Sequence, residues 1–350
     1  MKRFGYLILA TMMCSCTSGG FTVTGEVEGV NAGDSVMVFS YFDAEQRLAE
    51  GVVAKDGTFT LKGEANEPII GALVANGRNL IGTLIVESGD ITVGMNQRGA
   101  VEIAGTRFND ALVRYANESA VLEQKFMDID STLPAEEIQE ARDAIYDEYR
   151  EFMSATVKAN TDNIFGAYIF ASEEFNGLES SEAQARLAEF TPELLDLEFM
   201  KNLSESVESM LRTEVGKPYI DIKLTSIDGE QVSISDLLAD GKYVLVDFWA
   251  TWCNPCVAEL PHLKEAYAEF APKGLEIYGV SLDRSMDDWK AMVDSTIPWI
   301  NVIDNEEVAA STQYAVRTIP TNFLISPEGI IVAKNLRGED VAKILGENIK

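Results

Sequence analysis

The stretch VDFWATWCNPCVAELPHL, residues 246–263, decides the fold of the region around it. An apolar run typical of a buried strand ends here, and Cys253 and Cys256 follow with two residues between them. A helix that begins at Cys253 places unpaired backbone N–H groups and the positive end of its dipole beside that sulfur, which favours the thiolate. We therefore predict that Cys253 attacks a partner disulfide and that Cys256, one turn further and more buried, resolves the mixed disulfide.

Three other uses of a C-x-x-C pair compete with this redox interpretation. A structural zinc site needs four ligands, and without Cys14 and Cys16 of the N-terminal segment the chain offers two cysteines and a single histidine, His262. Covalent haem attachment requires a histidine directly after the second cysteine, where Val257 stands. A purely structural disulfide stays open, although closing so short a loop adds little stability. The pattern favours redox chemistry and indicates no metal.

Strands and helices alternate after the breaker cluster Gly216-Lys217-Pro218, which we take as a domain boundary. We expect strands over 242–250, 275–282, 321–326 and 330–336, and helices over 253–270, 285–295 and the last residues of the chain. This alternation predicts an α/β domain over residues 216–350, with a mixed sheet and helices on both of its faces.

Two different patterns precede that domain. Residues 21–105 alternate apolar and polar side chains between glycine-containing turns, which predicts a small antiparallel β-sandwich or barrel; the expected strands are 22–27, 35–42, 57–63, 83–88, 90–95 and 100–105. Residues 106–215 change to helical periodicity. One face carries Leu112, Tyr115, Leu122, Phe126 and Ile129, and another carries Ile138, Ala141, Ile145, Tyr149 and Phe152. We interpret these faces as helical core, with a helix starting at Pro134.

Length and charge exclude some classes of function. A chain of 350 residues is long enough for several modules, and 46% hydrophobic and 24% charged residues are typical of globular proteins. The 57 acidic residues outnumber the 28 basic ones, for a net charge of -29. Such a charge repels a phosphate backbone, so we expect no nucleic-acid partner.

The first 20 residues, MKRFGYLILATMMCSCTSGG, have the layout of a secretory signal. Lys2 and Arg3 precede about ten apolar residues, too few to span a bilayer. Cys16 then follows the small Ser15, and MCSC is similar to a bacterial lipoprotein cleavage box. We predict residues 1–20 to be a lipoprotein signal peptide and anchor, with Cys16 acylated. The alternative is a plain cleaved signal peptide.

Residues 216–350 resemble the TlpA/ResA type of thioredoxin-fold thiol-disulfide oxidoreductase. The motifs VDFWATWCNPC, Glu259-Leu260-Pro261 and VRTIPTNFLISPEG carry the resemblance. It implies a tethered location outside the bacterial cytoplasm, facing the periplasm. More weakly, the β-rich and helical segments resemble the accessory region of unknown role that precedes such domains in Bacteroidetes-type lipoproteins.

The resemblance implies further site residues. Asp247 matches a buried acid that accepts the proton of the resolving cysteine. Glu259 matches an acid placed close to the cysteines, although a surface helix position explains it equally well. Trp252 fits the apolar rim of the site. The Ile319-Pro320 peptide is expected to be cis and to lie against the cysteines, where the backbone of Ile319 can pair with an extended substrate.

These expectations predict an extracytoplasmic, membrane-anchored reductase of protein disulfides. Strong oxidants of this fold place His between the cysteines, and Asn254 and Pro255 stand there instead. Since the chain shows no flavin or nicotinamide fingerprint, we expect no cofactor and hypothesise an electron donor in the membrane. Two alternatives remain. One is a thiol peroxidase, for which Thr251 stands one residue from the needed position. The other is an envelope binding protein that uses the fold as a scaffold.

Overall fold

The computed structural model describes residues 19–43, 45–305 and 309–350, and these residues form two compact units. The first unit runs to Phe175 and includes Glu189–Phe199, and the second comprises Asn176–Ala188 and Met200–Lys350. The predicted helical segment 106–215 is therefore divided between the units. The domain boundaries expected after residues 105 and 215 stay predictions.

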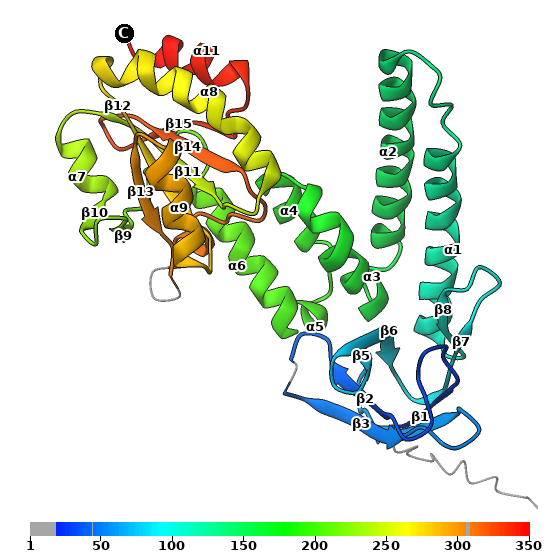
Figure 1. The fold of residues 1–350 in the computed structure, drawn as a ribbon. Helices are drawn as coiled ribbons and strands as arrows, with labels where there is room; N and C mark the ends of the chain where they lie inside the picture. Colours follow the sequence, from blue (N-terminus) through cyan, green and yellow to red (C-terminus); the bar gives the residue numbers. More distant parts are fainter. Residues whose placement is uncertain (1–18, 44, 306–308) are drawn as a thin grey trace, which may run out of the picture. The chain divides into compact units, whose positions relative to one another are not determined.

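Two four-stranded sheets form the β-rich part of the first unit (Figure 1). One has the order β4-β1-β7-β8 and the other β3-β2-β5-β6. The strands are β1 (Gly20–Gly25), β2 (Ser35–Ser40), β3 (Arg47–Val52), β4 (Phe59–Glu64), β5 (Ile69–Ala75), β6 (Asn79–Val86), β7 (Gly89–Met95) and β8 (Val101–Ala104). All pairs are antiparallel except β1 with β7, which run parallel. β3 and β5 lie outside the strands expected from the sequence.

The two sheets share one apolar core. Alternate residues of the strands point inward, including Val23 of β1, Leu61 of β4 and Leu73 of β5, each fully buried. The arrangement is the sandwich that the alternating pattern predicts.

Helices follow the sandwich along the chain. They are α1 (Arg107–Met127), α2 (Ala135–Lys158), α3 (Ile164–Ile169), the π-helix η1 (Phe170–Glu174), the 3-10 turn η2 (Phe175–Gly177), α4 (Ser180–Leu187), α5 (Pro192–Leu195) and α6 (Glu198–Arg212). Tyr115 of α1 stacks on Phe152 of α2 with ring centroids 5.0 Å apart, so the two predicted apolar faces meet. α2 begins directly after Pro134, as expected.

A seven-stranded mixed sheet is the centre of the second unit in the described residues. Its order is β10-β9-β13-β12-β11-β14-β15, in which β11, β12 and β13 are parallel and the other neighbours antiparallel. The strands are β9 (Lys223–Ser226), β10 (Gln231–Ser233), β11 (Tyr243–Trp249), β12 (Leu275–Ser281), β13 (Ile300–Ile303), β14 (Thr321–Ile325) and β15 (Ile331–Lys334).

Helices cover both faces of this sheet, as predicted for an α/β domain. α8 (Asn254–Phe270) and α11 (Glu339–Asn348) pack on one face beside Leu245. α7 (Ile234–Ala239) and α10 (Ala310–Gln313) contribute to the core on the other face, which contains Val244 and Val246. η3 (Ala271–Lys273) extends α8, and α9 (Met286–Thr296) follows β12. The short elements β9, β10, β13, α7 and α10 are additions to the elements expected from the sequence.

Candidate active site

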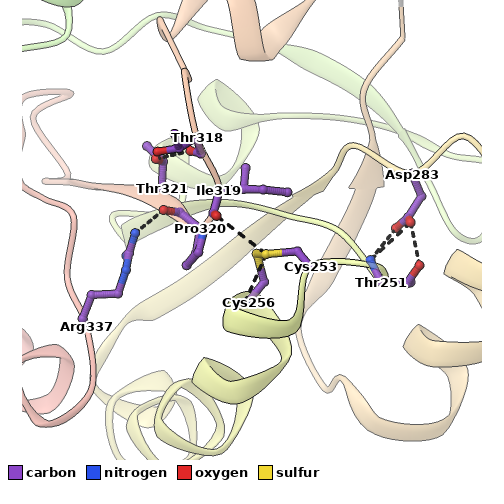
Figure 2. Close-up of a disulfide and its surroundings, with 9 residues drawn as sticks. All are labelled: Thr251, Cys253, Cys256, Asp283, Thr318, Ile319, Pro320, Thr321 and Arg337. Carbon is purple, nitrogen blue, oxygen red and sulfur yellow. Dashed lines mark hydrogen bonds between the residues drawn. A yellow bond between two sulfur atoms is a disulfide. The ribbon is translucent and has the colours of Figure 1, made fainter. Parts of the chain in front are cut away.

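The two cysteines lie where β11 gives way to α8. β11 ends at Trp249, and α8 begins at Asn254 with Cys253 as its N-cap. The Cys253 sulfur accepts a hydrogen bond from the Cys256 N–H at 3.2 Å, and the two sulfurs form a disulfide with an S–S distance of 2.09 Å (Figure 2). The helix therefore presents its unpaired N–H groups to Cys253, the position that favours a thiolate after reduction.

Burial distinguishes the two cysteines less than the sequence suggests. Cys253 is 5% exposed and Cys256 is 3% exposed, so both are buried. They pack in an apolar cluster with Trp249 of β11 and with Trp289 and Val293 of α9. The difference between the sulfurs comes from the helix end, because Cys253 caps the helix and Cys256 lies inside its first turn.

A loop before β14 lies against the disulfide. The Ile319–Pro320 peptide is cis, and the Ile319 carbonyl oxygen lies 3.7 Å from the Cys253 sulfur (Figure 2). Thr321 Oγ1 donates to the Thr318 carbonyl at 2.7 Å, and Arg337 Nη2 donates to the Pro320 carbonyl. In the part of the chain that the structure describes, the Ile319 N–H has no acceptor, which leaves it available to an approaching peptide.

Asp247 is a buried acid on β11, six residues before Cys253. Strand alternation directs its side chain to the sheet face covered by α8, and the residue is 4% exposed. Burial raises the pKa of Asp247 to about 6; the Arg337 cation and the amide of Asn322 oppose this rise, and the Glu259 charge adds to it. Asn322 stands directly opposite Asp247 on β14. Its amide also exchanges two hydrogen bonds with the backbone of Leu336, at 2.8 and 3.0 Å.

Glu259 faces the segment after β15. One of its oxygens accepts the Gly338 N–H at 2.8 Å, and the side chain is half-buried. Its charge acts on Asp247 together with that of Arg337. Asp247, Glu259 and Arg337 therefore form one electrostatic group, and the hydrogen bond from Arg337 to the Pro320 carbonyl links this group to the cis-proline loop.

Two tryptophans flank the motif in different settings. Trp252 precedes the first cysteine and is 64% exposed, a large apolar surface next to the disulfide. Trp249 is 2% exposed, and its indole N–H has no hydrogen-bond partner in the described residues. Trp252 thus fits a rim position and Trp249 belongs to the cluster beneath. Pro261 lies inside α8.

The region that carries this site is similar to known proteins. A family model described as the AhpC/TSA family matches residues 215–334. A protein named thiol-disulfide oxidoreductase ResA from Bacillus anthracis is 31% identical over 140 residues, which cover 40% of this chain and 74% of that protein. The chain belongs to the ResA family of thiol-disulfide oxidoreductases.

Further matches cover different parts of the chain. A ResA from Oceanobacillus iheyensis is 39% identical over 108 residues, and the match spans 30% of this chain and 54% of the length of that relative. The solved thioredoxin domain of a thiol-disulfide oxidoreductase from Bacteroides vulgatus is 36% identical, covers 39% of this chain and 99% of that chain, and has a TM-score of 0.37. A domain of unknown function (DUF4369) matches residues 21–112.

The structure of this ResA-family chain adds a residue that sequence reasoning missed. Asp283, which follows β12, accepts hydrogen bonds from the Thr251 N–H at 3.0 Å and from the Thr251 hydroxyl at 2.6 Å (Figure 2). It also accepts one from the Ser281 hydroxyl at 2.8 Å. It holds the loop that carries Trp252 and Cys253. The sequence offered a signal for Asp283, since it is a polar residue directly after the predicted strand 275–282. The carboxyl ends of parallel strands meet at one edge of a sheet, which places such a residue near the end of β11.

The described residues bear on the lipidation site, on membrane-crossing helices and on metal sites as follows. The predicted lipidation site Cys16 lies outside them. Within residues 19–43, 45–305 and 309–350, no helix combines the length and the apolar character needed to cross a bilayer. In the same residues, no three His, Cys, Asp or Glu side chains gather where they could hold a metal ion.

Proposed function

We propose that this ResA-family chain is an extracytoplasmic, membrane-anchored reductase of protein disulfides that uses the dithiol Cys253-x-x-Cys256. The observation that carries the proposal is the position of the Cys253 sulfur at the N-terminus of α8. There the sulfur accepts a hydrogen bond from the Cys256 N–H and lies beside the Ile319 carbonyl. This position activates one thiol and places it next to a backbone segment with a free N–H group.

The proposed reaction begins with the reduced pair. The Cys253 thiolate attacks one sulfur of the substrate disulfide; the substrate S–S bond breaks, and one substrate cysteine leaves as a thiolate. Cys256 then loses its proton and attacks the Cys253 sulfur, which releases the second substrate thiolate. Two electrons pass to the substrate, its thiolates take up two protons, and the enzyme ends in the disulfide form seen in the structure.

Asp247 is the proposed acceptor of the Cys256 proton. Its pKa of about 6 lies close to neutral pH, so at pH 7 it is mostly a carboxylate and still basic enough to take a proton. Glu259 and Arg337 act on the charge of Asp247 from opposite directions. We therefore assign Glu259 an electrostatic role through Asp247 in place of direct contact with the sulfurs.

Substrate contact is proposed for Trp252, Ile319 and Pro320. An extended segment of the substrate would pair with the Ile319 N–H, while the exposed Trp252 ring would cover its apolar side chains. Cys256→Ala stops the resolving step, so this variant should hold substrates as mixed disulfides that can be purified and identified. An absence of trapped envelope proteins would contradict a reductase of protein disulfides.

The direction of electron flow is the first property to measure. Asn254 and Pro255 supply no cationic side chain between the cysteines to stabilise the reduced thiolate further. We expect a reduction potential more negative than about -220 mV in glutathione or dithiothreitol buffers. A potential near -120 mV would mark an oxidant and overturn the proposed direction.

Location and re-reduction complete the proposal. Acylation of Cys16 would tether the chain to a membrane, and a membrane thiol donor would return electrons to the disulfide. Cys16→Ser in the producing bacterium should release the protein from the membrane fraction, and labelled palmitate should no longer enter it. A protein that stays in the membrane fraction without Cys16 would contradict the anchor.

The double variant Cys253→Ser, Cys256→Ser separates an enzyme from a binding scaffold, because only a scaffold keeps its biological function.

A further inference from the structure

The first unit contains a cavity of about 690 Å³ that lies apart from the disulfide. The outer strand of one sheet, β6, and the outer strand of the other, β8, line it together with α1; Tyr149 of α2 and Glu173 of η1 complete it. Its volume falls in the range of sites that hold small molecules. Most of its lining is apolar, from Ile81, Val101, Ile103, Leu112, Val113 and Ala116.

Polar groups converge at one place in this cavity. The Tyr115 hydroxyl donates to Glu173 Oε2 at 2.6 Å, and the Tyr149 hydroxyl donates to the same oxygen. Burial and the Glu173 charge raise the pKa of both tyrosines, so both stay protonated donors. Glu173 Oε1 takes part in no hydrogen bond within the described residues. The two hydrogen bonds to Oε2 thus fix the orientation of the carboxylate, and Oε1 remains free to accept a hydrogen bond from a ligand.

The charge balance of the cavity favours a cation. The lining contains three acidic residues, Glu102, Glu123 and Glu173, and one basic residue, Arg98. The Arg98 guanidinium donates a hydrogen bond to Asn117 at 2.7 Å. Across the residues that the structure describes, no Lys or Arg nitrogen lies within 4.0 Å of the Glu173 carboxylate. A partly buried carboxylate with no cationic neighbour gains most from a ligand that supplies one.

The backbone at Glu173 is unusual as well. Glu173 lies in η1, a single π-helical turn over Phe170–Glu174. Such turns are rare and occur often at functional sites, because the extra residue re-aims the side chains of its turn. Here the neighbour Glu174 is 2% exposed, while Glu173 lines the cavity.

We propose that this cavity binds an aliphatic ammonium group, with the cation on Glu173 and the hydrocarbon chain along the apolar wall. The group has two sources of identical chemistry, a free alkylamine or the lysine side chain of a protein. Both have an apolar stem of a few carbons that suits the apolar wall, and both have an ammonium group whose N–H donors suit the free oxygen of Glu173.

The test titrates the full chain with three probes of equal size, hexylamine, hexanol and hexanoate, by calorimetry at pH 7 and low salt. We expect hexylamine to bind at least about tenfold more tightly than hexanol, as one charge-assisted hydrogen bond requires, and hexanoate to bind no better than hexanol. Equal binding of hexylamine and hexanol would overturn the proposal without any variant being made.

Variants locate the site. Glu173→Gln should remove the preference for hexylamine, whereas Glu136→Gln, an exposed acid at the start of α2, should keep it. If Glu173→Gln does not fold, Ala116→Trp fills the cavity from an exposed helical position and should abolish binding of hexylamine. Unchanged hexylamine affinity in the folded variant would contradict the assignment.

A last comparison distinguishes the two sources. Nα-acetyl-lysine methylamide carries the same ammonium group on a peptide-like body. If it binds more tightly than hexylamine, the cavity takes a lysine side chain of a protein; if it binds more weakly, the cavity takes a free amine. The proposal fails if neither compound shows a preference that depends on Glu173.

Discussion

The two units of this chain carry their chemistry in different ways. In the second unit, Cys253 and Cys256 are three positions apart, and a strand end and a helix start bring them together. In the first unit, the polar groups around Glu173 come from α1, α2 and η1, up to 58 positions apart. A site built at one chain turn leaves a motif in the sequence, whereas a site assembled from separate elements leaves none. Variants made in each unit would show whether the units also differ in function.

The largest effect is expected from the nucleophile. Cys253→Ser removes the thiolate, so reduction of insulin disulfides should fall at least about 1,000-fold. The matched variant Thr318→Ser changes an exposed residue of the cis-proline loop and should keep its rate. If the first unit alone carried the biological function, Cys253→Ser would lose the insulin activity and keep the phenotype of the wild type.

Asp247→Asn should affect rate and stability in opposite directions. Loss of the proton acceptor should slow the resolving step at pH 7 by roughly 100-fold. The folded pKa of about 6 lies above the ordinary value of 3.8, so the folded protein holds more protons than the unfolded chain between these values, and stability falls as pH rises through this window.

The stability of the Asp247→Asn variant should not fall with rising pH in this way, because asparagine carries no charge. The variant should be more stable than the wild type by up to about 3 kcal/mol at pH 8, and this gain should disappear at pH 3.5. Urea unfolding at the two pH values measures the difference. A gain of equal size at both values would show that the effect does not come from the buried charge.

Asp283→Ala should loosen the loop before the cysteines. It leaves the N–H and hydroxyl of Thr251 without their acceptor, and we expect a loss of about 2 kcal/mol in the free energy of unfolding. Asp228→Ala, an exposed acid in the turn between β9 and β10, is the control and should change stability by less than about 0.5 kcal/mol. Equal losses of unfolding free energy in the two variants would contradict the positioning role of Asp283.

Arg337→Met should change the pH profile more than the rate maximum. The cation lowers the pKa of Asp247, so its removal should move the acid limb of the rate profile upward by about one pH unit. Arg337→Lys keeps the charge and should restore most of the profile. A profile that stays in place in the methionine variant would show that Arg337 acts only through the Pro320 carbonyl.

The smallest effect is expected from the cavity. Glu173→Gln should change insulin reduction by less than about twofold, because no described contact joins Glu173 to a residue of the active site. A larger loss would show that the cavity and the disulfide are coupled, and it would break the contrast between the units.

Sequence reasoning reached the elements with strong local patterns. The buried run of β11, the helix start at Cys253 and the start of α2 after Pro134 all follow from neighbouring residues. Short elements such as β9 and β10, of four and three residues, carry too few alternations to be distinguished from loops. The parallel pairing of β1 with β7 depends on contacts between strands more than 60 positions apart, which no local pattern records.

The sequence by itself determined the class of chemistry, because two thiols at a helix start, in a chain with almost no others, are suited to disulfide exchange. It also predicted an α/β domain over residues 216–350 through the alternation of buried strands and helices. Only the tertiary structure decided which groups act on that chemistry from a distance. Asn322, Arg337 and Asp283 reach the site across strands and loops, and Tyr115, Tyr149 and Glu173 meet in the cavity of the first unit. The reason is physical: burial and charge depend on distance in space, which neighbouring residues in the sequence do not set.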